Sequence, residues 1–128
     1  MSDKIVELSL LWYEYVTMEH HKDRDCHWCI SVDYGYGRAP KYRAYHSGYI
    51  TDADLQASDL DSLAEAEAVL LGFIRSAMVE QIEWARLVLA EPDEYDAEQN
   101  ASARFALERF PAALKLHTIF NRAPEDGE

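Results

Sequence analysis

The densest group of side chains that could perform chemistry lies in the first half of the chain. Four of its members could bind zinc: His20, Cys26, Cys29 and His46. A structural zinc site needs four Cys or His ligands in a tetrahedral arrangement, commonly with a Cys-x-x-Cys pair on a tight turn. Here the pair lies in a segment with strand alternation, and residues three apart on a strand point to opposite faces. We therefore expect no metal and no other cofactor. A zinc site formed by these four residues is the weaker alternative.

A nucleophilic site is the other chemistry that this region could support. A thiolate at Cys29 would need an imidazole, from His27 or His46, and a carboxylate such as Asp33 to orient it. His27, Cys29 and Asp33 would share one strand face, but no flanking signature of a catalytic cysteine accompanies them. The sequence thus favours a protein that is not an enzyme. A small metal- or ligand-binding domain, or an enzyme, using the His20, His27, Cys29 and His46 region is kept as the alternative.

These side chains require a sheet to hold them. Residues 5–18 favour a strand because branched and aromatic residues dominate, although helical spacing is also satisfied by Leu8, Leu11, Trp12 and Tyr15. Residues 26–34 alternate clearly between apolar and polar, and residues 42–50 resume that pattern after a turn marked by glycines and a proline. We therefore predict a three-stranded antiparallel meander, with residues 26–50 forming a hairpin.

The second half of the chain predicts helices. Ser62 and Glu65 fit a capping box, and apolar residues at helical spacing follow as far as Pro92. A second helix is expected over residues 93–110, with Pro111 either kinking it or starting a short terminal helix. The predicted architecture is a single α+β domain over residues 1–128, in the order β-β-β-α-α, with residues 1–4 and 123–128 frayed.

The charge of the chain limits the classes of partner. The net charge is -12, and residues 44–98 hold 13 acidic side chains against two basic ones. Direct binding to nucleic acids or anionic membranes relies on Lys and Arg, so both are disfavoured. No stretch is long and apolar enough to predict a membrane span, and two cysteines fit a reducing compartment, so we expect a cytoplasmic protein.

Two surfaces could bind a protein partner: the acidic helices and the tyrosine-rich hairpin. Tyrosine is favoured at interfaces, and a dense carboxylate field attracts a basic surface. The residues predicted to bind the partner are Tyr36, Tyr45, Tyr49, Glu80, Glu83, Asp93, Glu94, Asp96 and Glu98. The function hypothesis is an acidic, non-enzymatic binding module, acting as an adaptor or as an inhibitor of a nucleic-acid-binding surface. A homodimer formed through exposed aromatic residues or an uncovered edge strand is a third hypothesis.

Overall fold

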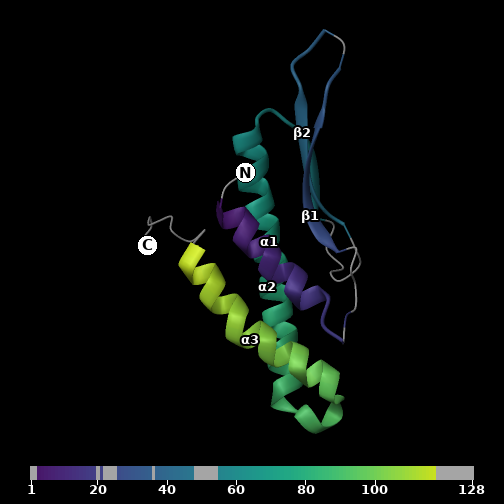
Figure 1. Cartoon of the computed structure of the whole chain (residues 1–128), viewed down its shortest axis with the longest axis vertical. Coiled ribbons are helices and arrows are strands. Elements are labelled where there is room, and N and C mark those ends of the chain that lie inside the picture. Colours follow the sequence, from purple (N-terminus) through teal and green to yellow (C-terminus); the bar gives the residue numbers. More distant parts are fainter. Residues whose placement is uncertain (1–2, 20, 22–25, 36, 48–54, 118–128) are drawn as a thin grey trace.

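The computed structural model describes residues 3–19, 21, 26–35, 37–47 and 55–117 of the chain (Figure 1). In chain order, these residues form α1 (Asp3–Val16), β1 (His27–Asp33), β2 (Lys41–Ser47), β3 (Gln56–Leu60), α2 (Leu63–Ala90), the 3-10 turn η1 (Pro92–Glu94) and α3 (Ala97–His117). The predicted α+β class, with a three-stranded antiparallel meander followed by helices, is confirmed. Of the termini predicted to be frayed, residues 1–2 and 123–128 lie outside the described residues, whereas Asp3 and Lys4 belong to α1.

The first element is a helix, so the prediction of a strand over residues 5–18 is wrong. Five side chains of α1 are buried, at spacings that place them on one helix face: Ile5, Leu8, Trp12, Tyr15 and Val16. A strand would have divided this set between two faces and left part of it in water. Burial of the whole set therefore outweighs the β preference of the branched and aromatic residues, and α1 precedes the sheet.

The hairpin predicted over residues 26–50 is confirmed for its described part, which consists of β1 and β2. In its antiparallel register, Trp28 lies opposite His46, and Cys29 lies opposite Tyr45. Side chains alternate between the two faces of a strand, so these two pairs face opposite sides of the sheet. Residues 48–50 lie outside the described residues.

The third strand, β3, was not predicted. Gln56–Leu60 contains no β-branched or aromatic residue, so its composition gives no signal for a strand. The pairing of β3 with β2 contains a register shift between Tyr42 and Ala44, and Asp59 adopts a left-handed backbone with φ of 60°. Such an irregularity is typical of an edge strand, where one residue falls out of the hydrogen-bonding ladder.

The helical half follows its predicted signals closely. Ser62 caps α2, its hydroxyl accepting a hydrogen bond from the Glu65 amide at 3.1 Å, while the Glu65 carboxylate accepts from the Asp61 amide at 2.9 Å. The helix ends before Pro92, as expected. The second long helix begins at Ala97 rather than at residue 93, and it continues through Pro111, so that no separate terminal helix starts there.

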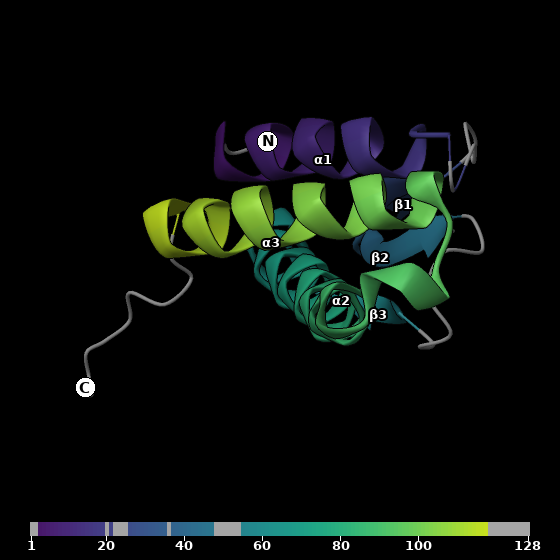
Figure 2. The same cartoon turned by 90° about the horizontal axis from the view of Figure 1, so that it is seen from below.

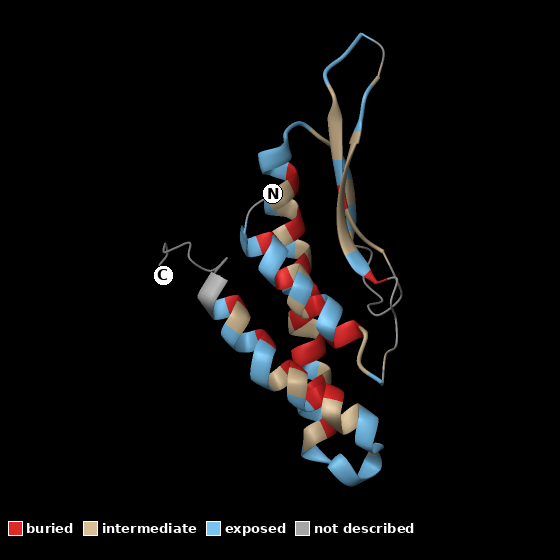
Figure 3. Cartoon of the chain, viewed as in Figure 1, coloured by how far each residue is buried: buried red, intermediate tan, exposed pale blue. Residues whose placement is uncertain are grey.

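The helices pack on one face of the sheet. Figure 2 shows α1 and α3 side by side; α2 contacts all three strands, α1 contacts β1, and no described helix covers the other sheet face. Buried residues lie where the three helices meet one another and the lower part of the sheet (Figure 3). Trp12, Tyr15 and Phe110 are the largest of the fully buried side chains. The far end of the β1–β2 hairpin projects beyond the helices (Figure 1).

Candidate functional site

The most acidic part of the described surface lies at the connection between α2 and α3. Five exposed carboxylates occur there, and we call them the acidic end: Glu91, Asp93, Glu94, Asp96 and Glu98. Residues 87–103 contain no Lys or Arg, so no basic side chain adjacent in sequence neutralises this charge. In Figure 1 the acidic end forms the lowest turn of the molecule, and Figure 3 shows that turn as largely exposed.

Hydrogen bonds fix the backbone of the acidic end. The Asp96 carboxylate accepts from the Gln99 amide at 2.7 Å, and the Gln99 side-chain oxygen accepts from the Asp96 amide at 3.0 Å. This reciprocal pair is a capping box at the start of α3. The Asn100 side-chain amide also donates to the carbonyl oxygens of Pro92, Tyr95 and Asp96, at 3.0, 3.2 and 2.9 Å. The carboxylates are therefore displayed on an ordered turn.

Asp96 differs from the other acidic-end residues because its carboxylate stabilises α3. Replacement by alanine (Asp96→Ala) should lower the free energy of unfolding by about 1 kcal/mol, the usual cost of losing an N-cap acceptor. The exposed neighbour Asp93 makes no capping bond of this kind, so Asp93→Ala should change it by less than about 0.5 kcal/mol. Urea denaturation followed by circular dichroism measures both, and equal effects would contradict the assigned capping role.

The remaining residues predicted to bind a partner are distributed elsewhere. Glu83 is exposed and Glu80 is half-buried, both on α2, upstream of the acidic end. Tyr45 lies in β2, and Tyr36 and Tyr49 lie outside the described residues. The structure thus brings Asp93, Glu94, Asp96 and Glu98 together, and it places Tyr45 in a different layer of the fold.

Tyr45 lies on the sheet face that no described helix covers. A hydrogen bond with the Cys29 thiol, its neighbour across the two strands, raises the pKa of Tyr45. The Arg43 guanidinium stands 4.4 Å from the centre of the Tyr45 ring, within the range of a cation–π contact. These three side chains form a small polar and aromatic group.

On the opposite sheet face, His46 lies among aromatic rings and the thiol of Cys26. The Trp12 indole N–H donates to His46 Nε2 at 3.1 Å, and Cys26 Sγ is 2.9 Å from the same nitrogen. The centre of the Trp28 ring lies 4.5 Å from that of the imidazole. Because an indole N–H only donates, Nε2 is the acceptor in its contact with Trp12, whereas the direction of its contact with Cys26 depends on the tautomer of the imidazole.

The residues of the alternative hypothesis, a metal- or ligand-binding site or an enzyme, do not all lie on one face of the sheet. His46 and Cys26 face the helices, whereas Cys29 pairs with Tyr45 on the other face and His27 is exposed. His20 lies outside the described residues. Within the described part of the chain, no three His, Cys, Asp or Glu side chains are grouped so that they could hold a metal ion.

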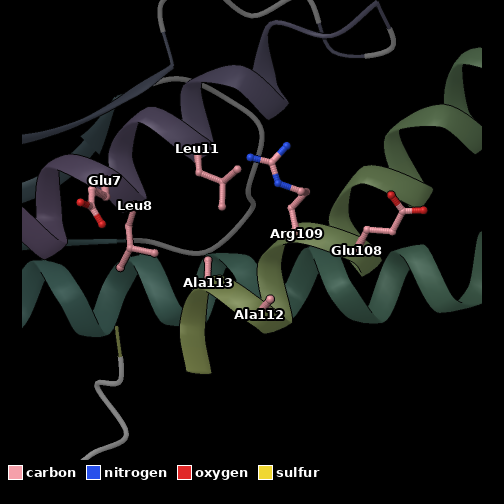
Figure 4. A pocket seen from close by; sticks show the side chains of 7 residues that line it. All are labelled: Glu7, Leu8, Leu11, Glu108, Arg109, Ala112 and Ala113. Carbon is pink, nitrogen blue, oxygen red and sulfur yellow. The ribbon is translucent and has the colours of Figure 1, made fainter. Parts of the chain in front are cut away.

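Two pockets between α1 and α3 were missed by the sequence analysis. The first, the α1–α3 groove, has a volume of about 300 Å³ and is lined by Glu7, Leu8, Leu11, Glu108, Arg109, Ala112 and Ala113. Figure 4 shows Leu8 and Leu11 pointing from α1 toward α3, and Arg109 reaching toward α1. Arg109 lies 3.9 Å from the Glu14 carboxylate. No sequence signal marks this groove, because its walls come from opposite ends of the chain.

The second pocket, which we call the end pocket, lies beside the acidic end. It has a volume of about 330 Å³ and is lined by Met18, Glu19, Ala97, Glu98 and Ala101. Met18 and Glu19 follow α1, which ends at Val16, and the other three residues lie in the first turns of α3. Figures 1 and 2 both place the end of α1 beside the start of α3. Glu98 belongs to both features, so the end pocket opens within the acidic surface.

Comparison with protein-family models, curated proteins and solved structures finds no match to this chain. None of the described helices has the length and apolarity needed to cross a membrane. Inferences about function therefore rest on the geometry of the acidic end, the two pockets and the sheet.

Proposed function

We propose that the chain is a protein-binding module that engages a basic surface of a partner protein through the acidic end. The module acts either as an adaptor or as an inhibitor that covers a surface otherwise used to bind nucleic acid. No catalytic step is part of this proposal.

The observation that carries the proposal is the display of five exposed carboxylates on one ordered turn. Like charges held this close repel one another, and the repulsion is relieved when a basic surface approaches. Complementary charge accelerates association and selects the partner, while the hydrogen-bonded turn reduces the entropy lost on binding. A basic protein surface fits these features better than an anionic nucleic acid, which the same field would repel.

A pair of charge-matched variants tests the proposal. The acidic-end variant carries Asp93→Asn, Glu94→Gln and Glu98→Gln, and it leaves Asp96 intact because that residue caps α3. The control variant carries Asp3→Asn, Asp33→Asn and Glu108→Gln, three exposed carboxylates elsewhere, so both variants lose the same charge. Each immobilised protein is exposed to lysate at low salt, and the captured proteins are quantified by mass spectrometry along a salt series.

We expect a set of basic proteins that the wild type and the control variant retain and the acidic-end variant loses. Their capture should decline as salt shortens the Debye length from about 10 Å at 0.1 M to about 3 Å at 1 M. If added duplex DNA releases the captured proteins, the result supports a role as an inhibitor. If DNA does not release them, the result supports a role as an adaptor. Identical capture by the two variants would refute the role of the acidic end.

A further inference from the structure

The strand β1 forms one edge of the sheet, and β2 is the only described strand that pairs with it. The outer side of an edge strand presents a row of backbone N–H and C=O groups that can pair with a further strand. β1 is seven residues long and keeps a regular register with β2 throughout. β3, the opposite edge, has a register shift and the left-handed backbone of Asp59, which disfavour further pairing there. β1 is therefore the edge better suited to add a strand.

One row of side chains along β1 is apolar and incompletely covered. Trp28, Ile30 and Val32 share the sheet face that meets the helices, where the Trp28 ring lies 5.6 Å from that of Trp12, but all three are only half-buried. Alternation continues the row to Tyr34, which is 83% exposed at the end of the hairpin that projects beyond the helices (Figure 1). The row can therefore bury more apolar surface if a strand is added at this edge.

This row is complementary to its own reverse. Two copies of β1 can pair antiparallel with Ser31 of one copy opposite Ser31 of the other. In that register Ile30 lies opposite Val32 of the second copy, and Trp28 lies opposite Tyr34. Side chains directly opposite each other share a face and contact one another, and pairs of aromatic or of branched aliphatic residues are favourable there. A second copy of the chain thus matches the whole row.

Charge also favours this arrangement. The hairpin segment, residues 26–47, has three basic residues against the single acidic Asp33, a balance of +2 in a chain of net charge -12. Antiparallel pairing turns the second copy end for end, so the two acidic ends would lie at opposite ends of the dimer (Figure 1). The basic hairpin end of each copy would point toward the side of the other copy's acidic end. Repulsion between the copies is thereby kept small.

We propose that β1 pairs with β1 of a second copy, which joins the two three-stranded sheets into one continuous sheet. The contact is isologous, so it closes at a dimer and adds no third copy. This inference goes beyond the proposed function and does not depend on it, because the acidic end takes no part in the pairing. The dimer presents two acidic ends to a partner, which raises the affinity for a partner with two basic sites.

Sedimentation equilibrium of the whole chain at increasing protein concentration tests the proposal. We expect the mass to rise from that of one chain to that of two, with no larger species. Ser31→Lys brings two ammonium groups together at the centre of the pairing and should weaken the dimer about tenfold. The matched control, Ser58→Lys, makes the same substitution on β3 at the other edge of the sheet and should leave the dimer unchanged.

The variant Ser31→Cys tests the register. Residues directly opposite each other on antiparallel strands have Cα atoms about 4.5–5.5 Å apart, within the range that a disulfide spans. Oxidised glutathione, which accepts the electrons and protons of the two introduced thiols, should therefore convert this variant to a covalent dimer. Ser58→Cys carries the same native cysteines and should remain a single chain. Non-reducing electrophoresis separates the products, and peptide mass spectrometry identifies the linked residues.

The outcomes are distinct. A single-chain mass at every concentration would overturn the proposal. So would a dimer that Ser31→Lys weakens no more than Ser58→Lys, because another surface would then hold the copies together. Should circular dichroism show that Ser31→Lys does not fold, the cysteine variants decide, and equal crosslinking of both would refute pairing through β1. All four substitutions leave the acidic end unchanged, so failure of the dimer leaves the proposed function standing.

Discussion

Replacing Trp12 by alanine (Trp12→Ala) will lower the free energy of unfolding by about 3–5 kcal/mol, the cost typical of deleting a fully buried aromatic side chain. Trp12 has no exposed surface, and its ring lies 5.6 Å from that of Trp28 and 6.0 Å from that of Phe110. The side chain therefore joins α1 to the sheet and to α3. Its removal leaves a cavity at the junction of three elements.

The loss has a polar component as well. Trp12 donates a hydrogen bond to His46, and Trp12→Phe removes this donor while keeping an aromatic ring. We expect Trp12→Phe to cost less than the alanine change, because part of the packing remains. Tyr13→Ala is the control, since Tyr13 is 43% exposed on the same helix and should contribute little. Urea unfolding followed by far-UV circular dichroism measures all three, and a loss for Trp12→Ala no larger than for Tyr13→Ala would contradict the packing described.

Sequence patterns predicted the elements whose local and tertiary preferences agree. The alternation in residues 27–33 and the cap at Ser62 identified β1 and the start of α2, because each pattern has one favourable conformation. Residues 5–18 satisfied both a strand and a helix pattern, and only the contacts of α1 with α2, α3 and β1 decide between the two. β3 shows the opposite case, since pairing with β2 imposes a strand on residues with little preference for one.

The features of the candidate site also divide into those that the sequence predicts and those that depend on tertiary packing. The acidic end could be predicted because its carboxylates are neighbours along the chain, from Glu91 to Glu98. The opposite orientation of Cys29 and His46 follows from strand alternation once the register is known. The contact of Cys26 with His46, and the meeting of Met18 with Ala101 in the end pocket, depend on how distant segments pack. Sequence periodicity carries no information about such contacts.

Tyr15 provides the second large effect, and this effect depends on pH. The Tyr15 hydroxyl donates to the Gln81 side-chain oxygen at 2.6 Å, in a buried position between α1 and α2. Tyr15→Phe leaves that oxygen without its donor, so near neutral pH the variant should be less stable by about 1–3 kcal/mol. The ring contact with Phe110, at 4.9 Å between centroids, is available to both proteins and cancels from the comparison.

Above pH 10 the difference between the two proteins should shrink. Burial raises the pKa of Tyr15 above the ordinary value of 10.0, so the phenol remains neutral in the folded chain when it ionises in the unfolded chain. Its contribution to stability is complete below pH 10 and is then lost by up to about 1.4 kcal/mol for each further pH unit. The phenylalanine variant has no proton to lose at this position, and every other titratable group is common to both proteins. Urea unfolding at pH 7, 9, 10 and 11 measures the difference in stability, and a constant difference across that series would show that burial does not raise the pKa of Tyr15.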